Sequence, residues 1–137
     1  MEIFHDKVNT NFKVCIVEDD PMIQEIYQTA LETEGYKVIQ AFDGEEGLAL
    51  IKKEMPDIAL VDIMMNKKDG ICLIKDLQKD PQLVAIPVII ITNRSDEKTM
   101  EEAGKLNTKF YLEKSLFKPK DIVEYVKEAL YGKMPRS

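Results

Sequence analysis

The chain has few of the residues that bind zinc. Its 137 residues include one histidine, His5, and two cysteines, Cys15 and Cys72. A structural zinc site needs several cysteine or histidine ligands at short, regular spacing, so the sequence excludes one. Both cysteines fall in apolar segments that we predict to be part of the core, and we interpret them as buried thiols. This use of cysteine predicts a reducing, cytoplasmic compartment.

Long apolar runs and an excess of basic residues are also missing. No apolar stretch approaches the roughly 20 residues of a membrane span, and residues 1–11 show no signal-peptide pattern. The formal net charge is −6, whereas a surface that binds nucleic acid needs a basic face. We therefore predict no membrane segment and no direct nucleic-acid binding. With 45% hydrophobic residues, the length suits one domain, predicted at 12–132 between tails at 1–11 and 133–137.

Strand-like and helix-like segments alternate along the chain. The strands are predicted at 12–17, 36–41, 58–61, 87–92 and 110–112, and the helices at 20–35, 43–55, 71–80, 96–104 and 119–132. The β-branched run at 88–91 indicates a central parallel strand that is buried on both faces. This order predicts a single (βα)5 α/β domain, a flavodoxin-like doubly wound parallel sheet with strand order 2-1-3-4-5. The predicted apolar faces include Ile23, Ile26, Tyr27, Ala30 and Leu31 in the first helix, and Met100, Ala103 and Leu106 near 96–104.

Acidic residues close two of the predicted strands. Glu18 and Asp19 follow the first strand, and Asp62 follows the third. A carboxylate at the end of a buried strand is costly unless a charged or hydrogen-bonding group meets it. In the order 2-1-3-4-5 these two strands are neighbours, so the three acids converge at the edge where such sheets bind ligands. Three carboxylates at one point predict a bound cation.

Two further polar residues belong to the same edge. Thr92 ends the fourth strand and Lys114 follows the fifth. Taken singly, each of these residues has an ordinary structural explanation as a cap, a turn or a surface charge. As a set, in this order, they resemble the receiver domain of chemotaxis-type, two-component response regulators. The matching stretches are Val17–Pro21, Pro56–Met65, Asp69-Gly70, Ile89–Thr92 and Tyr111–Lys114, within a resemblance that runs from about Phe12 to Tyr131.

The resemblance implies a phosphoryl-transfer site. Asp62 would attack a phosphoryl group and become an acyl phosphate. Mg²⁺, for which Mn²⁺ could substitute, would offset the repulsion between the carboxylate and the phosphate. Asp19 and Asp62 would bind the ion directly, the backbone carbonyl of Met64 would add a ligand, and Glu18 would act mostly through water.

The resemblance also implies a switch. Lys114 would neutralise one phosphate oxygen and Thr92 would hydrogen-bond another. Tyr111 matches the receiver aromatic residue that turns inward when the threonine engages phosphate. The helix at 96–104, poor in apolar residues, is predicted to move with it and to form a reporting surface with the last strand and the last helix. Phe110 is expected to be an exposed apolar contact on this surface.

Several neighbours depart from the family pattern. Asn66 stands where proline is common after the Asp-Ile-Met-Met run. Ser115 replaces the proline that usually follows the lysine, so the Lys114–Ser115 bond is either trans in a rebuilt loop or cis under strain. We predict that the lifetime of the acyl phosphate is altered by Met64, Asn93 and Arg94, of which Met64 and Arg94 flank the path of attacking water in the family.

We interpret the chain as a phosphoacceptor receiver rather than a turnover enzyme. A histidine kinase or a histidine phosphotransfer protein would supply the phosphoryl group, and an unknown downstream protein would bind the switched surface. We interpret the chain as a stand-alone receiver, and the alternative is a receiver module excised from a larger response regulator or hybrid kinase. Less favoured interpretations are a receiver that binds partners without phosphorylation and a haloacid dehalogenase-like phosphatase. The phosphatase needs a second aspartate two residues after the nucleophile, where Met64 stands.

Overall fold

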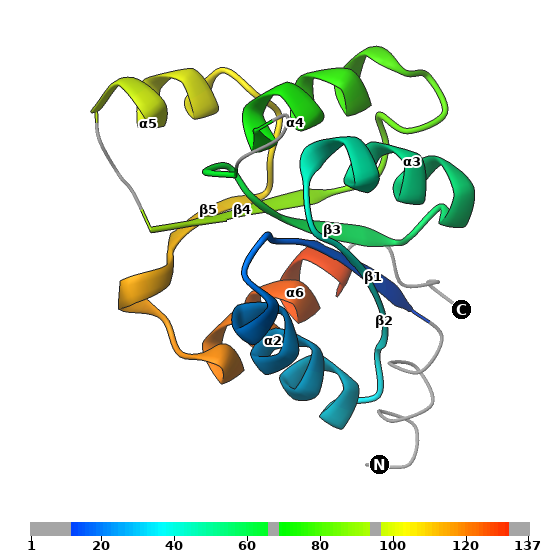
Figure 1. The fold of residues 1–137 in the computed structure, drawn as a ribbon, viewed down its shortest axis with the longest axis vertical. Coiled ribbons are helices and arrows are strands. Elements are labelled where there is room, and N and C mark those ends of the chain that lie inside the picture. The colour runs from blue at the N-terminus through cyan, green and yellow to red at the C-terminus, as the bar shows by residue number, and fades with distance from the viewer. Residues whose placement is uncertain (1–11, 66–68, 94–96, 132–137) are drawn as a thin grey trace.

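A computed structural model describes residues 12–65, 69–93 and 97–131 (Figure 1). Strands and helices alternate along these residues. The strands are β1 (Lys13–Val17), β2 (Lys37–Ala41), β3 (Ile58–Asp62), β4 (Val88–Thr92) and β5 (Phe110–Glu113). The helices are α2 (Pro21–Thr33), α3 (Gly44–Glu54), α4 (Gly70–Lys79), α5 (Glu97–Gly104), the short 3-10 helix η1 (Lys114–Leu116) and α6 (Pro119–Tyr131).

The sheet has the predicted topology. All neighbouring strands are parallel, in the order β2-β1-β3-β4-β5. Helices α2 and α6 cover one face, and α3, α4 and α5 cover the other (Figure 1). Every residue of β3 and β4 is buried, which explains their nearly continuous apolar sequences. The prediction of a flavodoxin-like α/β fold is therefore confirmed.

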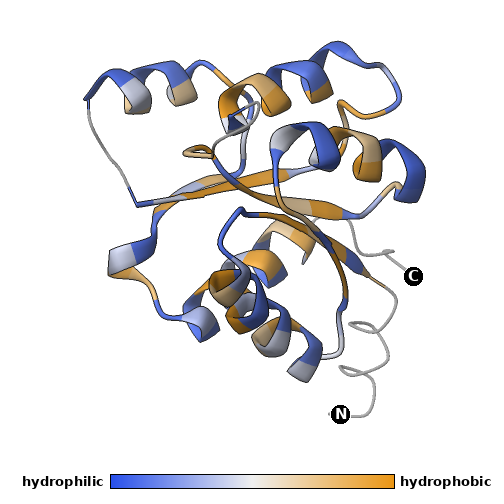
Figure 2. Ribbon diagram, viewed as in Figure 1, coloured by the Kyte–Doolittle hydropathy of each residue, from blue (hydrophilic) through white to orange (hydrophobic). Residues whose placement is uncertain are grey.

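The sheet separates two apolar cores. One core joins alternate strand residues such as Ile16 and Leu60 to α2 and α6. The other joins the intervening residues, such as Val17 and Val61, to α3, α4 and Ala103 of α5. Figure 2 shows the apolar strands between helices whose outer faces are hydrophilic. None of the helices that the structure describes is long and apolar enough to cross a membrane.

Aspartates begin three of the helices that follow strands. The Asp20 carboxylate accepts the N–H of Met22 at 2.9 Å, and Asp69 accepts the N–H of Cys72 at 2.9 Å. Asp43 caps α3 at Glu46, whose carboxylate in turn accepts the N–H of Phe42. Each carboxylate satisfies an N–H that has no partner within its helix and lies at the positive end of the helix dipole. Asp69, predicted as a turn residue, is thus a helix cap.

Four predictions about burial were wrong. Cys72 is exposed, because the helical period turns it away from its buried neighbours Ile71 and Leu73. Ile26 of α2 and Met100 of α5 are also exposed, at 44% and 47%. Phe110 is partly buried, because its ring packs edge-to-face against Tyr125 of α6 with ring centroids 4.8 Å apart. It is therefore not the exposed contact that the sequence suggested.

Helix α3 ends in a left-handed residue that is not glycine. Met55 has φ 48° and ψ 61°, and its N–H bonds the carbonyl of Ile51 at 2.9 Å. Left-handed geometry costs an L-residue roughly 1–2 kcal/mol. A glycine would avoid this strain, but it loses more conformational entropy on folding, which offsets part of the gain. We expect Met55→Gly to raise the free energy of unfolding by about 0.5–1 kcal/mol in urea titrations. Met55→Ala keeps Cβ and should show no such gain, and a loss of stability in the glycine variant would contradict this explanation.

Candidate functional site

Three carboxylates meet at the carboxyl edge of the sheet. Strands β1 and β3 are neighbours with Val17 opposite Val61, so Glu18 and Asp62 leave the sheet side by side. Oxygen atoms of Glu18, Asp19 and Asp62 all lie within 4.8 Å of one another. Glu18 is 3% exposed and Asp62 is 5% exposed. The structure thus brings together the three acids that the sequence placed at one edge.

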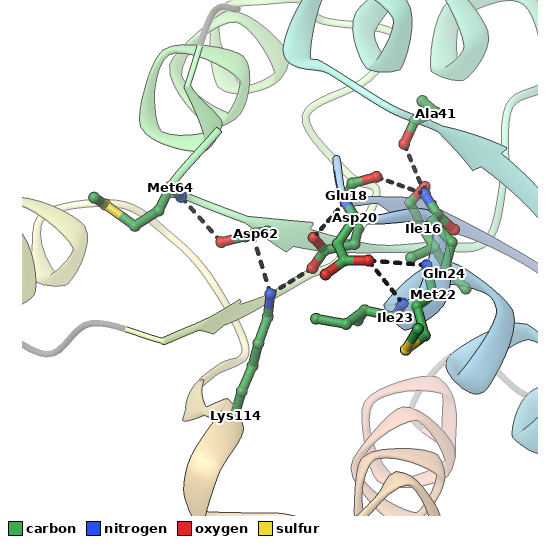
Figure 3. Close-up of polar contacts among 10 residues, drawn as sticks. All are labelled: Ile16, Glu18, Asp20, Met22, Ile23, Gln24, Ala41, Asp62, Met64 and Lys114. Atoms are coloured by element: carbon green, nitrogen blue, oxygen red, sulfur yellow. Dashed lines mark hydrogen bonds and ion pairs between the residues drawn. The ribbon is translucent and has the colours of Figure 1, made fainter. Parts of the chain in front are cut away.

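Lys114 supplies positive charge to this cluster. It follows β5 and begins η1, and its side chain is 8% exposed. Its Nζ donates to Oε1 of Glu18 and lies 3.1 Å from Oδ2 of Asp62 (Figure 3). The lysine thereby joins the acid that follows β1 to the acid that ends β3.

The pKa values reflect a shortage of positive charge. Burial raises the pKa of Glu18 to about 7, although Lys114 and the N–H of Asp20 favour its ionised form. Burial also raises the pKa of Asp62, against the N–H of Met64 and the charge of Lys114. For Lys114, burial alone would lower the pKa, but the pairing with Glu18 and Asp62 outweighs it and raises the pKa. One ammonium therefore leaves the carboxylates short of compensation, and the cluster favours a second cation.

Asp62 is held by its own loop as well as by the lysine. Its Oδ1 accepts the N–H of Met64 at 3.0 Å, while Oδ2 faces Lys114 (Figure 3). The Met64 side chain points outward and is 44% exposed. Both Asp62 oxygens are therefore oriented before any ligand binds.

Thr92 and Tyr111 lie on the same face of the sheet. Tyr111 of β5 pairs with Ile90 of β4, and Thr92 stands two residues beyond Ile90, so the period of the strand gives all three the same face. Thr92 is fully buried. Tyr111 is partly buried beside α5 and lines a groove there with Met100 and residues 103–104, 106 and 108–110. Ala103 is the buried residue of α5, in agreement with the prediction that this helix is weakly anchored.

The structure describes some of the loop residues that depart from the family pattern. Asn93 is exposed at the end of β4, whereas Arg94 and Asn66 lie outside the described residues. No cis peptide bond occurs in the described part of the chain, so the Lys114–Ser115 bond is trans. The loop is rebuilt as the 3-10 turn η1, in which Ser115 Oγ donates to Glu113 at 3.2 Å.

Gln24 also belongs to the site, although the sequence patterns did not predict it. This residue of α2 is 1% exposed and lies against the loop that carries Glu18 and Asp19. One signal was available, because Gln24 stands three residues before Tyr27 and seven before Leu31, on the buried face of the same helix. A glutamine at this spacing indicates a polar group inside the core.

Comparison with known proteins assigns a family to this site. Residues 14–127 match the response regulator receiver domain. The chain belongs to this family. Receiver domains are phosphoacceptor switches of two-component signal transduction rather than classical enzymes. Phosphorylation and Mg²⁺ binding at an acidic pocket are typical of the family.

Several curated relatives are response regulators or transcriptional regulators. The receiver is 36% identical to the probable transcriptional regulator ycf27 of Guillardia theta over 90% of this chain and 47% of the relative. It is 34% identical to the alkaline phosphatase synthesis transcriptional regulatory protein PhoP of Bacillus subtilis, over 88% of this chain and 49% of the relative. It is 38% identical to protein PilH of Pseudomonas aeruginosa over 68% of this chain and 76% of the relative. The chain spans about half the length of the first two.

Solved receiver structures have the same fold. The signal receiver domain of a histidine kinase from Syntrophus aciditrophicus aligns with TM-score 0.84 at 28% identity, over 92% of this chain and 94% of that one. The receiver domain of the Francisella response regulator 1452 aligns with TM-score 0.81 at 32% identity, over 90% and 99% of the two chains. The receiver fold thus covers nearly the whole described structure.

Proposed function

We propose that Asp62 of this receiver accepts a phosphoryl group from a phosphohistidine of a histidine kinase or a histidine phosphotransfer protein. The observation that carries the proposal is the buried Asp62 carboxylate between Lys114 and the acid pair. A surface carboxylate would not need this surrounding charge, whereas a group that receives an anionic phosphoryl group does. We propose further that the site works in the cytoplasm, as the sparse use of cysteine in the sequence suggests.

The step is an in-line displacement at phosphorus. An oxygen of Asp62 forms a bond to phosphorus while the bond between phosphorus and the histidine nitrogen breaks. The electron pair stays on the imidazole, which then takes a proton. Lys114 lies where it can neutralise a phosphoryl oxygen, and the N–H of Met64, which already bonds Asp62, keeps the carboxylate in position.

The donor set fits a magnesium ion. Carboxylate and carbonyl oxygens are the ligands that Mg²⁺ prefers, and the oxygens of Glu18, Asp19 and Asp62 are close enough to share one ion. Asp19 and Asp62 would bind it directly, Glu18 mainly through water, and the backbone carbonyl of Met64 would complete the protein ligands. When bound, Mg²⁺ would neutralise charge shared by the carboxylate and the phosphoryl oxygens. Glu18, paired with Lys114, is suited to a supporting role.

The phosphorylated site would signal through Thr92 and Tyr111. A phosphoryl group on Asp62 would draw the Thr92 hydroxyl, and Tyr111 would turn inward on the same face of the sheet. The weak anchoring of α5 supports this view, since a helix with one buried side chain has little packing to lose. The changed surface of α5, β5 and α6 would then bind a downstream protein, which in a longer protein could be a neighbouring domain. The relatives that extend beyond the matched region support such an arrangement.

The position of Met64 beside Asp62 supports the proposal that this residue lengthens the lifetime of the acyl phosphate. Met64 lies directly beside Asp62, and its exposed side chain, which points outward in the unphosphorylated site, would screen a phosphoryl group from water by folding over it. We expect phosphorylated Met64→Asn to hydrolyse about threefold to tenfold faster than the parent, because a shorter polar side chain admits and orients water. Decay of the phosphorylated form, followed by intact mass, measures the rate. Arg94→Ala gives the parallel test for Arg94, and unchanged rates in both variants would refute the screening role.

A direct experiment tests the proposed function. The protein is incubated with acetyl phosphate and Mg²⁺, and the phosphorylated form is counted by intact mass spectrometry. The parent should gain one phosphoryl group and Asp62→Asn none. Asp69→Asn, which keeps a helix-capping side chain, should react like the parent. An unreactive parent would favour the phosphorylation-independent binding module, and a reactive Asp62→Asn would exclude Asp62 as the acceptor. The phosphatase interpretation has no support from the site, since position 64 is methionine.

A further inference from the structure

Gln24 presents a buried amide to three backbone carbonyls. Its Nε2 lies 3.0 Å from the carbonyl of Ile16, 3.1 Å from that of Glu18 and 2.7 Å from that of Ala41 (Figure 3). Because all three neighbours are acceptors, the nitrogen end of the amide must face them. One side chain of α2 thus bonds the carboxyl ends of β1 and β2 and the loop between β1 and α2.

These bonds hold the peptide group that joins the acid pair. The N–H of Glu18 donates to the carbonyl of Ala41 at 3.0 Å, the same carbonyl that accepts from Gln24. The carbonyl of Glu18 belongs to the peptide group between Glu18 and Asp19, and it accepts from Gln24. The backbone of Glu18 is therefore fixed at both ends, and its orientation decides where the carboxylates of Glu18 and Asp19 point.

The same amide also has a feature that lowers the stability of the fold. Gln24 Oε1 is buried and has no hydrogen-bond partner among the described residues. A buried acceptor without a partner costs about 1–3 kcal/mol. An apolar side chain of similar size would remove this cost but would also leave the carbonyl of Glu18 without its donor, so the two effects on the free energy of unfolding oppose each other. The consequence of losing the amide should then appear at the site rather than in the fold.

We propose that Gln24 is a positioning residue of the phosphoacceptor site, which orients the Glu18–Asp19 peptide so that both acids face Asp62. The inference rests on the proposed function, because its effect is exerted on the metal-binding and phosphoryl-accepting acids. Groups that orient metal ligands typically change metal affinity by about 10–100-fold when removed. Gln24→Met should therefore weaken Mg²⁺ binding about tenfold and slow phosphorylation at a low, fixed Mg²⁺ concentration.

Magnesium titrations of the intact protein test this role. Mg²⁺ alone is added to the parent, Gln24→Met and Leu31→Ala, and the amide signals near the acid cluster are followed by NMR. Leu31 lies two turns further along the same buried face of α2, so its truncation destabilises the helix packing without removing a bond to the loop. All proteins are compared where denaturation curves show them folded. If Gln24→Met does not fold, Gln24→Asn, whose amide is one methylene too short to reach the same carbonyls, takes its place.

The outcomes separate the inference from the proposed function. A weaker Mg²⁺ affinity in the Gln24 variant, with Leu31→Ala within about twofold of the parent, supports positioning. Equal affinities in the parent and the Gln24 variant, or equal losses in both variants, overturn it, even if the parent is phosphorylated normally. A parent that neither binds Mg²⁺ nor reacts with acetyl phosphate overturns the proposed function and the inference with it.

Discussion

Replacing Lys114 with methionine should lower the free energy of unfolding by about 3 kcal/mol when no divalent metal is present. The variant keeps Glu18 and Asp62 buried but removes the ammonium that contacts both. Breaking a buried ion pair from one side costs about 3–5 kcal/mol, because the remaining charge has lost its partner. We expect the lower end of this range, since Glu18, with a pKa of about 7, can take up a proton instead.

Magnesium should reduce this loss. A divalent cation bound to the same carboxylates replaces the missing positive charge, so denaturation curves of Lys114→Met should approach those of the parent in saturating Mg²⁺. Phosphorylation should still fall by at least about 100-fold, because the group that would face the phosphoryl oxygens is gone. Lys118→Met is the matched control, since Lys118 is exposed a few residues further along. If both variants lose the same stability without metal, Lys114 does not neutralise the acids.

Replacing Gly70 with alanine should cost a similar amount by a steric route. A Cβ at Gly70 would lie 2.5 Å from the carbonyl oxygen of Asp62 and 2.6 Å from Cα of Ile63. Both are backbone atoms, so either α4 or the loop after β3 has to move. Overpacking of this kind typically costs about 1–3 kcal/mol. We expect a loss near the upper end of that range, together with slower phosphorylation, because the displaced carbonyl belongs to Asp62, the proposed phosphoacceptor.

Gly104 provides the control for this substitution. A Cβ there meets nothing within 4 Å, and the residue ends α5. Gly104→Ala should therefore leave phosphorylation unchanged and raise the free energy of unfolding by up to about 1 kcal/mol, the difference in helix propensity. Urea denaturation and acetyl phosphate labelling of the two variants give the comparison. Gly70→Ala with parental stability and labelling would show that α4 can retreat without disturbing Asp62.

The sequence was sufficient to place the acids because strand order and register follow from simple patterns. Buried strands with acidic ends predict which carboxylates share an edge, and β1 beside β3 brings Glu18 to Asp62. Lys114 could be placed for the same reason, as the residue that follows β5. Its two ion pairs could not be predicted in detail, because the sequence left the path of the chain after β5 open between a trans and a cis bond.

Most of the errors about burial concern helix residues whose direction the composition does not show. Cys72, Ile26 and Met100 are exposed, because local apolar composition does not say which way each residue of a helix faces. Gln24 was missed for the opposite reason, since a polar residue on an apolar face counts against burial until the carbonyls that it meets are known. Hydropathy reports the average preference of a residue type for burial, whereas the burial of these side chains is decided by the particular groups that they contact.

The aspartate caps have a consequence for the approach of phosphoryl donors. Asp20, Asp43 and Asp69 begin helices at the carboxyl ends of parallel strands, so they stand around the same rim as the acid cluster. Their charges add to a negative potential that reaches about one Debye length, near 10 Å at roughly 0.1 M salt. An anionic donor such as acetyl phosphate is repelled by this potential, and added salt weakens the repulsion. A donor protein with a basic surface around its phosphohistidine is attracted, and added salt weakens the attraction. If the proposed function holds, the residues that stabilise the helix starts would therefore also favour protein donors over free anions.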